Sequence, residues 1–197
     1  MQKLRYVVAA LLIVLALVGA FYYTFPSLQF RNVDLIKGTT TSSLVGVDVS
    51  MVAYYPGAAG YLAIPNLPGR LPGVVMIHEW WGLNDNIKGM AQQLAKEGYV
   101  VLAVDLYNGN VASTPNEASS LVSKLNSTEA VKNLRAAVNY LRSSDRVNPA
   151  RIGSIGWCFG GGQSLRLALS GEQLVATVIY YDLLWATRNR SSETFCN

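Results

Sequence analysis

Histidine is almost absent from this chain of 197 residues, which contains a single one, His78. Histidine is the commonest general base in enzymes, and here only one residue can supply a histidine base. Charged residues are also sparse, at 14%, and the formal net charge is only +4. The basic residues are scattered along the chain, without a basic stripe interleaved with aromatics, and this argues against nucleic-acid binding.

Cysteine is scarce as well, since only Cys158 and Cys196 occur. One lies in a glycine-rich turn and the other next to the chain end, a pattern that does not indicate a disulfide framework. His78 and Glu79 lack the second histidine of the H-E-x-x-H zinc motif, and no other cluster has the spacing of metal ligands. We therefore expect no metal and no other cofactor.

A long apolar run occupies the N-terminus. Residues 6–25 contain no charge over 20 residues, which is long enough to cross a bilayer as a helix. Lys3 and Arg5 precede the run and predict that everything after it lies outside, so the remaining chain would be extracytoplasmic. A cleaved signal peptide with a small-residue site at 18–20 stays open as an alternative, as does a buried soluble helix.

The composition divides the chain into four parts. Residues 1–30 form the predicted anchor and its flank, and residues 31–43 form a polar linker. Residues 44–181 form the predicted α/β domain, and residues 182–197 form an atypical tail. The membrane is therefore one predicted partner, reached through the N-terminal helix.

Short apolar runs alternate with helical periodicity through the predicted domain. This alternation is typical of a mostly parallel sheet with helices on both faces, and the first two runs, joined by Pro56-Gly57, predict an antiparallel edge. We expect strands at 44–55, 60–64, 73–77, 99–104, 152–155 and 174–180. We expect helices at 85–97, with Asp85 as the N-cap, and at 116–125, 128–142 and 164–169.

Gly156-Trp157-Cys158-Phe159-Gly160 lies between the strand at 152–155 and the helix that follows. It is a nucleophile elbow, G-x-S-x-G with cysteine in place of serine. A turn this sharp requires residues without bulk two positions before and after the nucleophile. The helix points its N-terminal amides at the sulfur, which favours the thiolate. The structural alternative is a buried small cysteine in an ordinary turn.

Polar residues gather where the predicted strands end. His78, Glu79, Asp105 and Cys158 all follow carboxyl ends of strands, and ligands bind at that edge of open α/β sheets. Successive strand side chains point to opposite faces, so we expect His78 to be a packed neutral histidine rather than the base if Glu79 faces Cys158. We expect Asp105 to be a turn or cap residue.

The chain resembles the dienelactone hydrolase family of α/β-hydrolases in three segments, 73–84, 98–107 and 156–161, whose order and spacing fit the family. The resemblance implies an ester or lactone as the small-molecule substrate and Cys158 as the nucleophile. It also implies that Glu79 holds the resting thiol and helps to activate it. The backbone amides of Trp80 and Phe159 would form the oxyanion hole. Trp80 and Trp81 line an aromatic pocket or pack in the core.

The chain departs from the family after Tyr181. The family carries two further strands there, followed by the triad aspartate and the triad histidine, and neither residue is matched in 182–197. We expect a shifted or shortened reading frame near Asp182, so that the last strands are missing; resequencing the gene tests this expectation. Two hypotheses follow. The first is a thiol hydrolase, and the second is an inactive remnant or a non-catalytic binding module.

Overall fold

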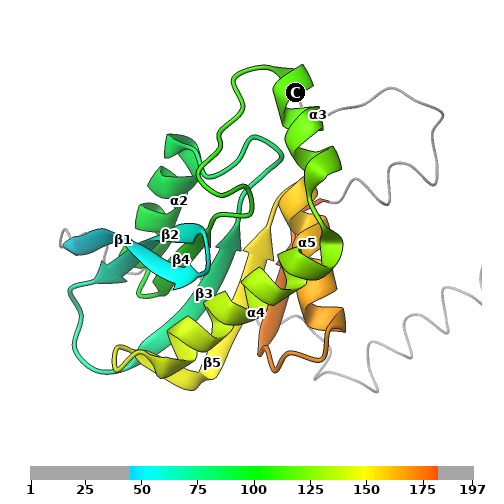
Figure 1. Cartoon of the computed structure of the whole chain (residues 1–197). Helices are drawn as coiled ribbons and strands as arrows, with labels where there is room; N and C mark the ends of the chain where they lie inside the picture. The colour runs from blue at the N-terminus through cyan, green and yellow to red at the C-terminus, as the bar shows by residue number, and fades with distance from the viewer. Residues whose placement is uncertain (1–44, 182–197) are drawn as a thin grey trace, which may run out of the picture. The chain divides into compact units, whose positions relative to one another are not determined.

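The computed structural model describes residues 45–181, which form one mixed sheet with helices packed against it (Figure 1). The predicted anchor, the linker at 31–43 and the tail at 182–197 lie outside these residues. Between residues 45 and 181, no helix has the length and apolar character needed to span a bilayer. The membrane anchor therefore stays a prediction.

The sheet has six strands in the order β1-β2-β4-β3-β5-β6. The last four of these are parallel neighbours, while β1 and β2 add the antiparallel edge that the sequence predicted. The strands are β1 (Val47–Tyr55), β2 (Ala58–Pro65), β3 (Leu71–Ile77), β4 (Val100–Val104), β5 (Val147–Gly156) and β6 (Ala176–Ile179).

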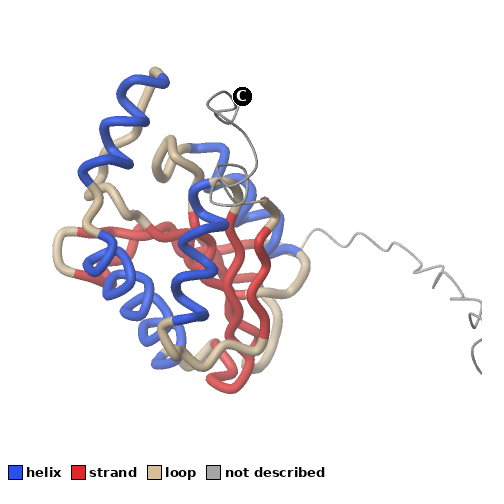
Figure 2. Tube along the Cα trace, turned by 90° about the vertical axis from the view of Figure 1, so that its right-hand side faces the viewer, coloured by secondary structure: helices blue, strands red, loops and turns tan. Residues whose placement is uncertain are grey.

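Helices cover both faces of the sheet, as Figures 1 and 2 show. α2 packs against β2 and β4, whereas α4 and α5 pack against β5 and against each other. The helices are α2 (Asp85–Lys96), α3 (Pro115–Lys124), α4 (Ser127–Ser143) and α5 (Phe159–Leu169). The mixed α/β class with helices on both faces is thus confirmed for the described residues.

Polar side chains cap the N-termini of α2, α3 and α4. Asn84, not the predicted Asp85, is the N-cap of α2, and its side chain accepts a hydrogen bond from the amide of Ile87. Asp85 instead lies in the first turn, where its charge suits the helix dipole. Thr114 forms a capping box with Glu117 at the start of α3, an arrangement that satisfies two exposed amide donors.

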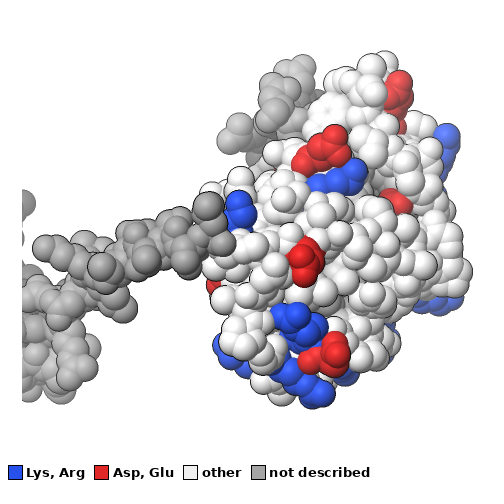
Figure 3. Space-filling view, turned by 90° about the vertical axis from the view of Figure 1, so that its left-hand side faces the viewer, with Lys and Arg blue, Asp and Glu red and all other residues white. Residues whose placement is uncertain are grey.

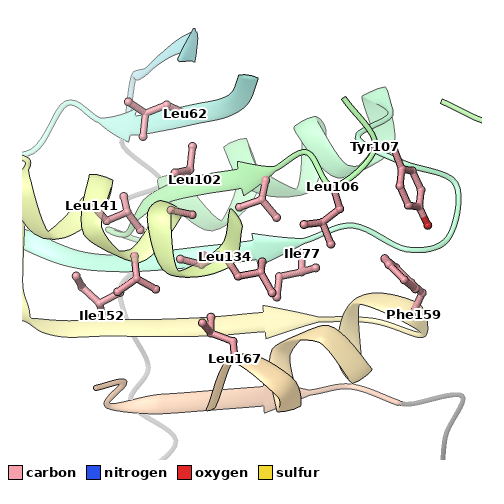
Figure 4. Close-up of a cluster of buried hydrophobic side chains, with 14 of the residues drawn as sticks. Leu62, Ile77, Leu102, Leu106, Tyr107, Leu134, Leu141, Ile152, Phe159 and Leu167 are labelled. Atoms are coloured by element: carbon pink, nitrogen blue, oxygen red, sulfur yellow. The ribbon is translucent and has the colours of Figure 1, made fainter. Parts of the chain in front are cut away.

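The core consists of two apolar layers, one on each face of the sheet. Along β4, Val100, Leu102 and Val104 belong to the layer under α4, which Figure 4 shows. Val101 and Ala103 belong to the layer under α2. Because strand side chains alternate between faces, a strand buried on both sides is continuously apolar. This explains why β4 has no polar residue.

The start of α5 differs from the prediction. The helix begins at Phe159, five residues before the predicted start at Ser164, and includes Gly160, Gly161 and Gly162 in its first turn. Glycine disfavours helix interiors by about 1 kcal/mol per residue, so the sequence indicated a loop. The close packing of this turn against neighbouring backbone, described below, outweighs that preference.

Charged groups do not gather by sign on the face shown in Figure 3, where basic and acidic side chains are interspersed. Among the described residues, Lys88 pairs with Asp85 at 2.9 Å and Lys132 with Glu129 at 2.8 Å. Exposed pairs of this kind contribute little to stability. The expected absence of nucleic-acid binding stays a prediction.

Candidate active site

Cys158 has an unusual backbone conformation. It is the N-cap of α5, two residues after the end of β5, with φ 53° and ψ −120°. Among the described residues other than glycine, only Cys158 and Asn108 have positive φ. Such a conformation costs about 1–3 kcal/mol and persists where the surrounding structure enforces it. The strained strand-to-helix turn is the geometry expected of a nucleophile elbow.

The glycines around Cys158 are required by close backbone approach. A Cβ atom at Gly156 would collide with the carbonyl group of Gly160. A Cβ atom at Gly160 would collide with the carbonyl oxygens of Ile77 and His78 at the end of β3. The first turn of α5 therefore lies directly against the backbone that leads to Glu79.

The sulfur of Cys158 is enclosed by the protein. Cys158 is 0% exposed and belongs to the apolar layer under α4. Cys158 is also disulfide-bonded, whereas the sequence pattern did not indicate a disulfide. Since the thiolate is the reactive form of cysteine, any nucleophilic role requires reduction of this bond and opening of the site.

The sheet register brings Glu79 and Cys158 to the same edge. β3 and β5 are parallel neighbours in which Ile77 is paired with Gly156. Glu79 follows Ile77 by two residues, and Cys158 follows Gly156 by two residues. Two of the predicted site residues thus leave adjacent strands at matched positions, although the sequence places them 79 residues apart.

Glu79 contacts the segment that follows β6. The hydroxyl of Tyr181 donates a hydrogen bond to Oε1 of Glu79 over 3.1 Å. Partial burial and then the bond to Glu79 raise the pKa of Tyr181, so the hydroxyl stays a donor at neutral pH. Tyr181 was not among the predicted site residues, because no short-range sequence pattern signals a contact between residues so distant in the chain.

His78 is buried, and both of its ring nitrogens are hydrogen-bonded. Its Nδ1 lies 2.5 Å from the carbonyl oxygen of Glu79, and its Nε2 lies 3.2 Å from the amide nitrogen of Leu106. Burial lowers the pKa of the imidazole, which keeps the ring neutral. The prediction of a packed, hydrogen-bonded neutral histidine is confirmed, and His78 is not placed to act as the base.

Asp105 organises a turn, as predicted. One carboxylate oxygen accepts the amide of Tyr107 over 2.8 Å, and the other accepts the amide of Gly109. The Asp105 carbonyl oxygen accepts a hydrogen bond from the side-chain amide of Asn133 over 3.0 Å. These bonds fix the loop that follows β4 and carries Tyr107 toward the elbow.

Trp80 packs in the core. It is 4% exposed and meets Trp81 edge-on, with ring centroids 5.0 Å apart. Trp80 belongs to the apolar layer under α4, and Trp81 packs against that layer while partly buried. Of the two interpretations of this pair, core packing is the one that the structure bears out.

The aromatic rings of Phe159 and Tyr107 pack against each other beside the turn that contains Cys158. Their ring centroids lie 5.7 Å apart, and both rings are near the carboxyl ends of the strands (Figure 4). A pocket of about 430 Å³ lies beyond Tyr107, between the β1–β2 turn and the α3–α4 segment. Neither Cys158 nor Glu79 lines it. Among residues 45–181, no three metal-binding side chains gather at one place.

Comparisons with known proteins agree with this geometry. The chain is 35% identical over 138 residues to Protein usf of Aquifex pyrophilus, covering 66% of this chain and 58% of that protein. It is also 35% identical over 127 residues to a protein of Bradyrhizobium sp named "Probable 2-oxo-3-(5-oxofuran-2-ylidene)propanoate lactonase", covering 63% of this chain and 51% of that protein. The chain thus spans between half and three fifths of the length of these relatives.

A solved structure supports the fold. A dienelactone hydrolase-like promiscuous phosphotriesterase from metagenomic libraries superposes with a TM-score of 0.64 and 29% identity, covering 69% of this chain and 59% of that one. The family model described as "Dienelactone hydrolase family" matches residues 58–194, which include the elbow, the end of β3 and part of the segment after Tyr181. This chain belongs to the dienelactone hydrolase family.

Proposed function

We propose that this chain is a hydrolase of ester or lactone bonds in which the thiolate of Cys158 is the nucleophile. The observation that carries the proposal is the positive-φ conformation of Cys158 between β5 and α5. Family membership and the lactonase name of one relative support the substrate class. The site would comprise Cys158, Glu79 and the backbone amides of Trp80 and Phe159.

Catalysis would proceed in two steps. Glu79 takes the thiol proton, and the sulfur attacks the carbonyl carbon, forming a C–S bond and an oxyanion that the amides of Trp80 and Phe159 stabilise. The oxyanion collapses and the C–O bond breaks; the leaving alkoxide takes the proton from Glu79. Water then hydrolyses the thioester and releases the acid and the thiol. Oxyanion donors of this kind contribute about 3–4 kcal/mol each.

The test is hydrolysis of p-nitrophenyl acetate by the full-length chain, purified in a mild nonionic detergent with a thiol reductant. The reductant is needed because Cys158 is disulfide-bonded in the structure. We expect Cys158→Ala to remove the rate above the buffer blank. Cys196→Ala is the matched control, because it removes the other cysteine of the chain and should retain the rate.

The second candidate is a non-catalytic member of the family. One observation favours it: both ring nitrogens of His78, the single histidine of the chain, are hydrogen-bonded inside the protein. Without a histidine base, serine hydrolases keep only a small residual rate. Equal rates for the wild type and Cys158→Ala, under reducing conditions, would establish this candidate in place of the first.

We also propose that the domain is extracytoplasmic and held at a membrane by residues 6–25. The support is the uncharged 20-residue run preceded by Lys3 and Arg5. Expression with a C-terminal reporter that is active on one side of the membrane tests the orientation. Recovery of the full-length chain in the supernatant after cell lysis and ultracentrifugation would contradict the anchor.

A further inference from the structure

We propose that His78 is a positioning residue that orients the peptide between Glu79 and Trp80, so that its N–H can serve the oxyanion hole. The inference deepens the proposed function and rests on it. It assigns a specific task to the only histidine of the chain, which touches no substrate and is not the base. Three features of the structure support it: the tautomer, the peptide geometry and the ring packing.

The hydrogen bonds determine the tautomer of His78. The amide of Leu106 can only donate, so Nε2, 3.2 Å away, must accept. In a neutral imidazole the other nitrogen then carries the proton. Nδ1 therefore donates to the carbonyl oxygen of Glu79, 2.5 Å away. The ring bridges the loop after β3 and the loop after β4, with one bond in each direction.

The hydrogen bond from His78 to the Glu79 carbonyl constrains the peptide that also carries the Trp80 N–H. The carbonyl of Glu79 and the N–H of Trp80 belong to the same planar peptide, and the described chain contains no cis peptide bond. In a trans peptide the two groups point in opposite directions. The two donors to this carbonyl, Nδ1 of His78 and the amide of Gly82 at 3.3 Å, therefore fix the direction of the Trp80 N–H. They also polarise the peptide, which makes that N–H a stronger donor.

Packing prevents the ring from turning. His78 is 0% exposed, and its centroid lies 4.8 Å from that of Tyr107 and 5.9 Å from that of Phe159. The ring is nearly parallel to Phe159, at 18°, and Phe159 supplies the second proposed oxyanion amide. His78 thus bonds to the carbonyl of the peptide that carries the Trp80 N–H, and it packs against the ring of Phe159.

The experiment compares three variants of the full-length chain under the reducing conditions of the esterase assay. His78→Asn places an amide donor near the Nδ1 position. His78→Gln reaches the Nε2 position without that donor, and His78→Phe keeps the ring but removes both bonds. We expect His78→Asn to keep kcat within about threefold. We expect the other two to lose at least tenfold in kcat, with KM changed less than twofold.

Folding and function are separated by two further measurements. Urea unfolding gives the folded fraction of each variant, and each kcat is corrected for that fraction. If His78 had a purely structural role, the corrected kcat values of the three variants would be equal. That result would overturn the inference. Nitrogen-15 NMR of the imidazole reports the protonated nitrogen, and a proton on Nε2 would also overturn it.

The proposed function can fail separately. If the wild type shows no hydrolysis beyond Cys158→Ala, the proposed function fails and the inference fails with it. If the wild type hydrolyses the ester and His78→Phe matches it after correction, only the inference fails.

Discussion

Tyr181 and Glu79 are 102 positions apart in the chain, and the tyrosine hydroxyl donates to a carboxylate oxygen of the glutamate over 3.1 Å. This bond joins the segment after β6 to the segment after β3, across the strand that leads to Cys158. It gives the carboxylate of Glu79, the proposed proton acceptor of the thiol, a partner from a distant segment of the chain.

Replacement of Tyr181 by Phe tests this contact. Because a hydrogen bond contributes about 0.5–1.5 kcal/mol, we expect the Cys158-dependent kcat to fall about two- to tenfold. Tyr181 is 46% exposed, so the free energy of unfolding should stay within about 0.5 kcal/mol of the wild type. Tyr180→Phe is the matched control, since its neighbouring ring is 71% exposed. Equal effects of the two substitutions would contradict the role of the bond.

The strained backbone of Cys158 predicts an unusual stability order. We expect Cys158→Gly to be about 1–2 kcal/mol more stable than Cys158→Ala, because glycine adopts positive φ without the cost that a Cβ imposes. Both variants lack the sulfur, so the disulfide does not affect the comparison. Urea denaturation measures the difference. An alanine variant as stable as the glycine variant would show that the turn is not strained.

The close approach at Gly160 predicts a second stability effect. A Cβ at this position would lie 2.5 Å from the carbonyl oxygen of His78 and still nearer to that of Ile77, so Gly160→Ala should cost about 3 kcal/mol or more. At Gly89 in α2, an added Cβ meets nothing within 4 Å. Gly89→Ala should therefore stabilise the protein by about 0.5–1 kcal/mol through helix propensity. Thermal unfolding of both variants checks the two signs.

The buried His78 predicts the pH dependence of stability near neutrality. Burial lowers the pKa of its imidazole, while Asp105 raises it by a smaller amount. As the pH falls, the His78 imidazole of the unfolded chain takes up a proton near pH 6.5, and that of the folded chain does so only at a lower pH. The free energy of unfolding should therefore decrease as the pH falls from 7.5 to 5.5, by at most about 1.4 kcal/mol per unit. His78→Asn should flatten this profile, and parallel profiles would refute the assignment.

A buried polar network predicts the cost of removing one hydroxyl. Tyr54 donates to Oδ1 of Asn133 over 2.6 Å, and its oxygen accepts the amide of Asp105 over 3.0 Å. Burial raises the pKa of Tyr54, so its hydroxyl stays protonated. Tyr54→Phe leaves both partners unsatisfied and should cost about 1–3 kcal/mol. Tyr55, bonded to Glu129 at the surface, supplies the control, and its replacement by Phe should have a much smaller effect on urea unfolding.

Local patterns determined a large part of this fold. Continuous apolar runs such as β4, and the 3.6-residue period of α2 and α4, depend on neighbours in the chain, so elements and their order follow from the sequence. The nucleophile elbow is equally local, because five consecutive residues specify a strand, a tight turn and a helix. The start of α5 was predicted too late in the sequence, because the helical conformation of its glycine-rich first turn depends on contact with β3.

Tertiary structure alone decided that the candidate site residues lie at one edge of the sheet. The sequence by itself determined that Cys158 occupies a glycine-flanked turn and that Glu79 follows an apolar strand. Only the register of β3 with β5 brings them to matched positions, and only the return of the chain at Tyr181 supplies a partner for Glu79. Burial of Cys158 and of both faces of the His78 ring likewise depends on residues distant in sequence. Strand pairing and packing act over such separations, and no local pattern contains them.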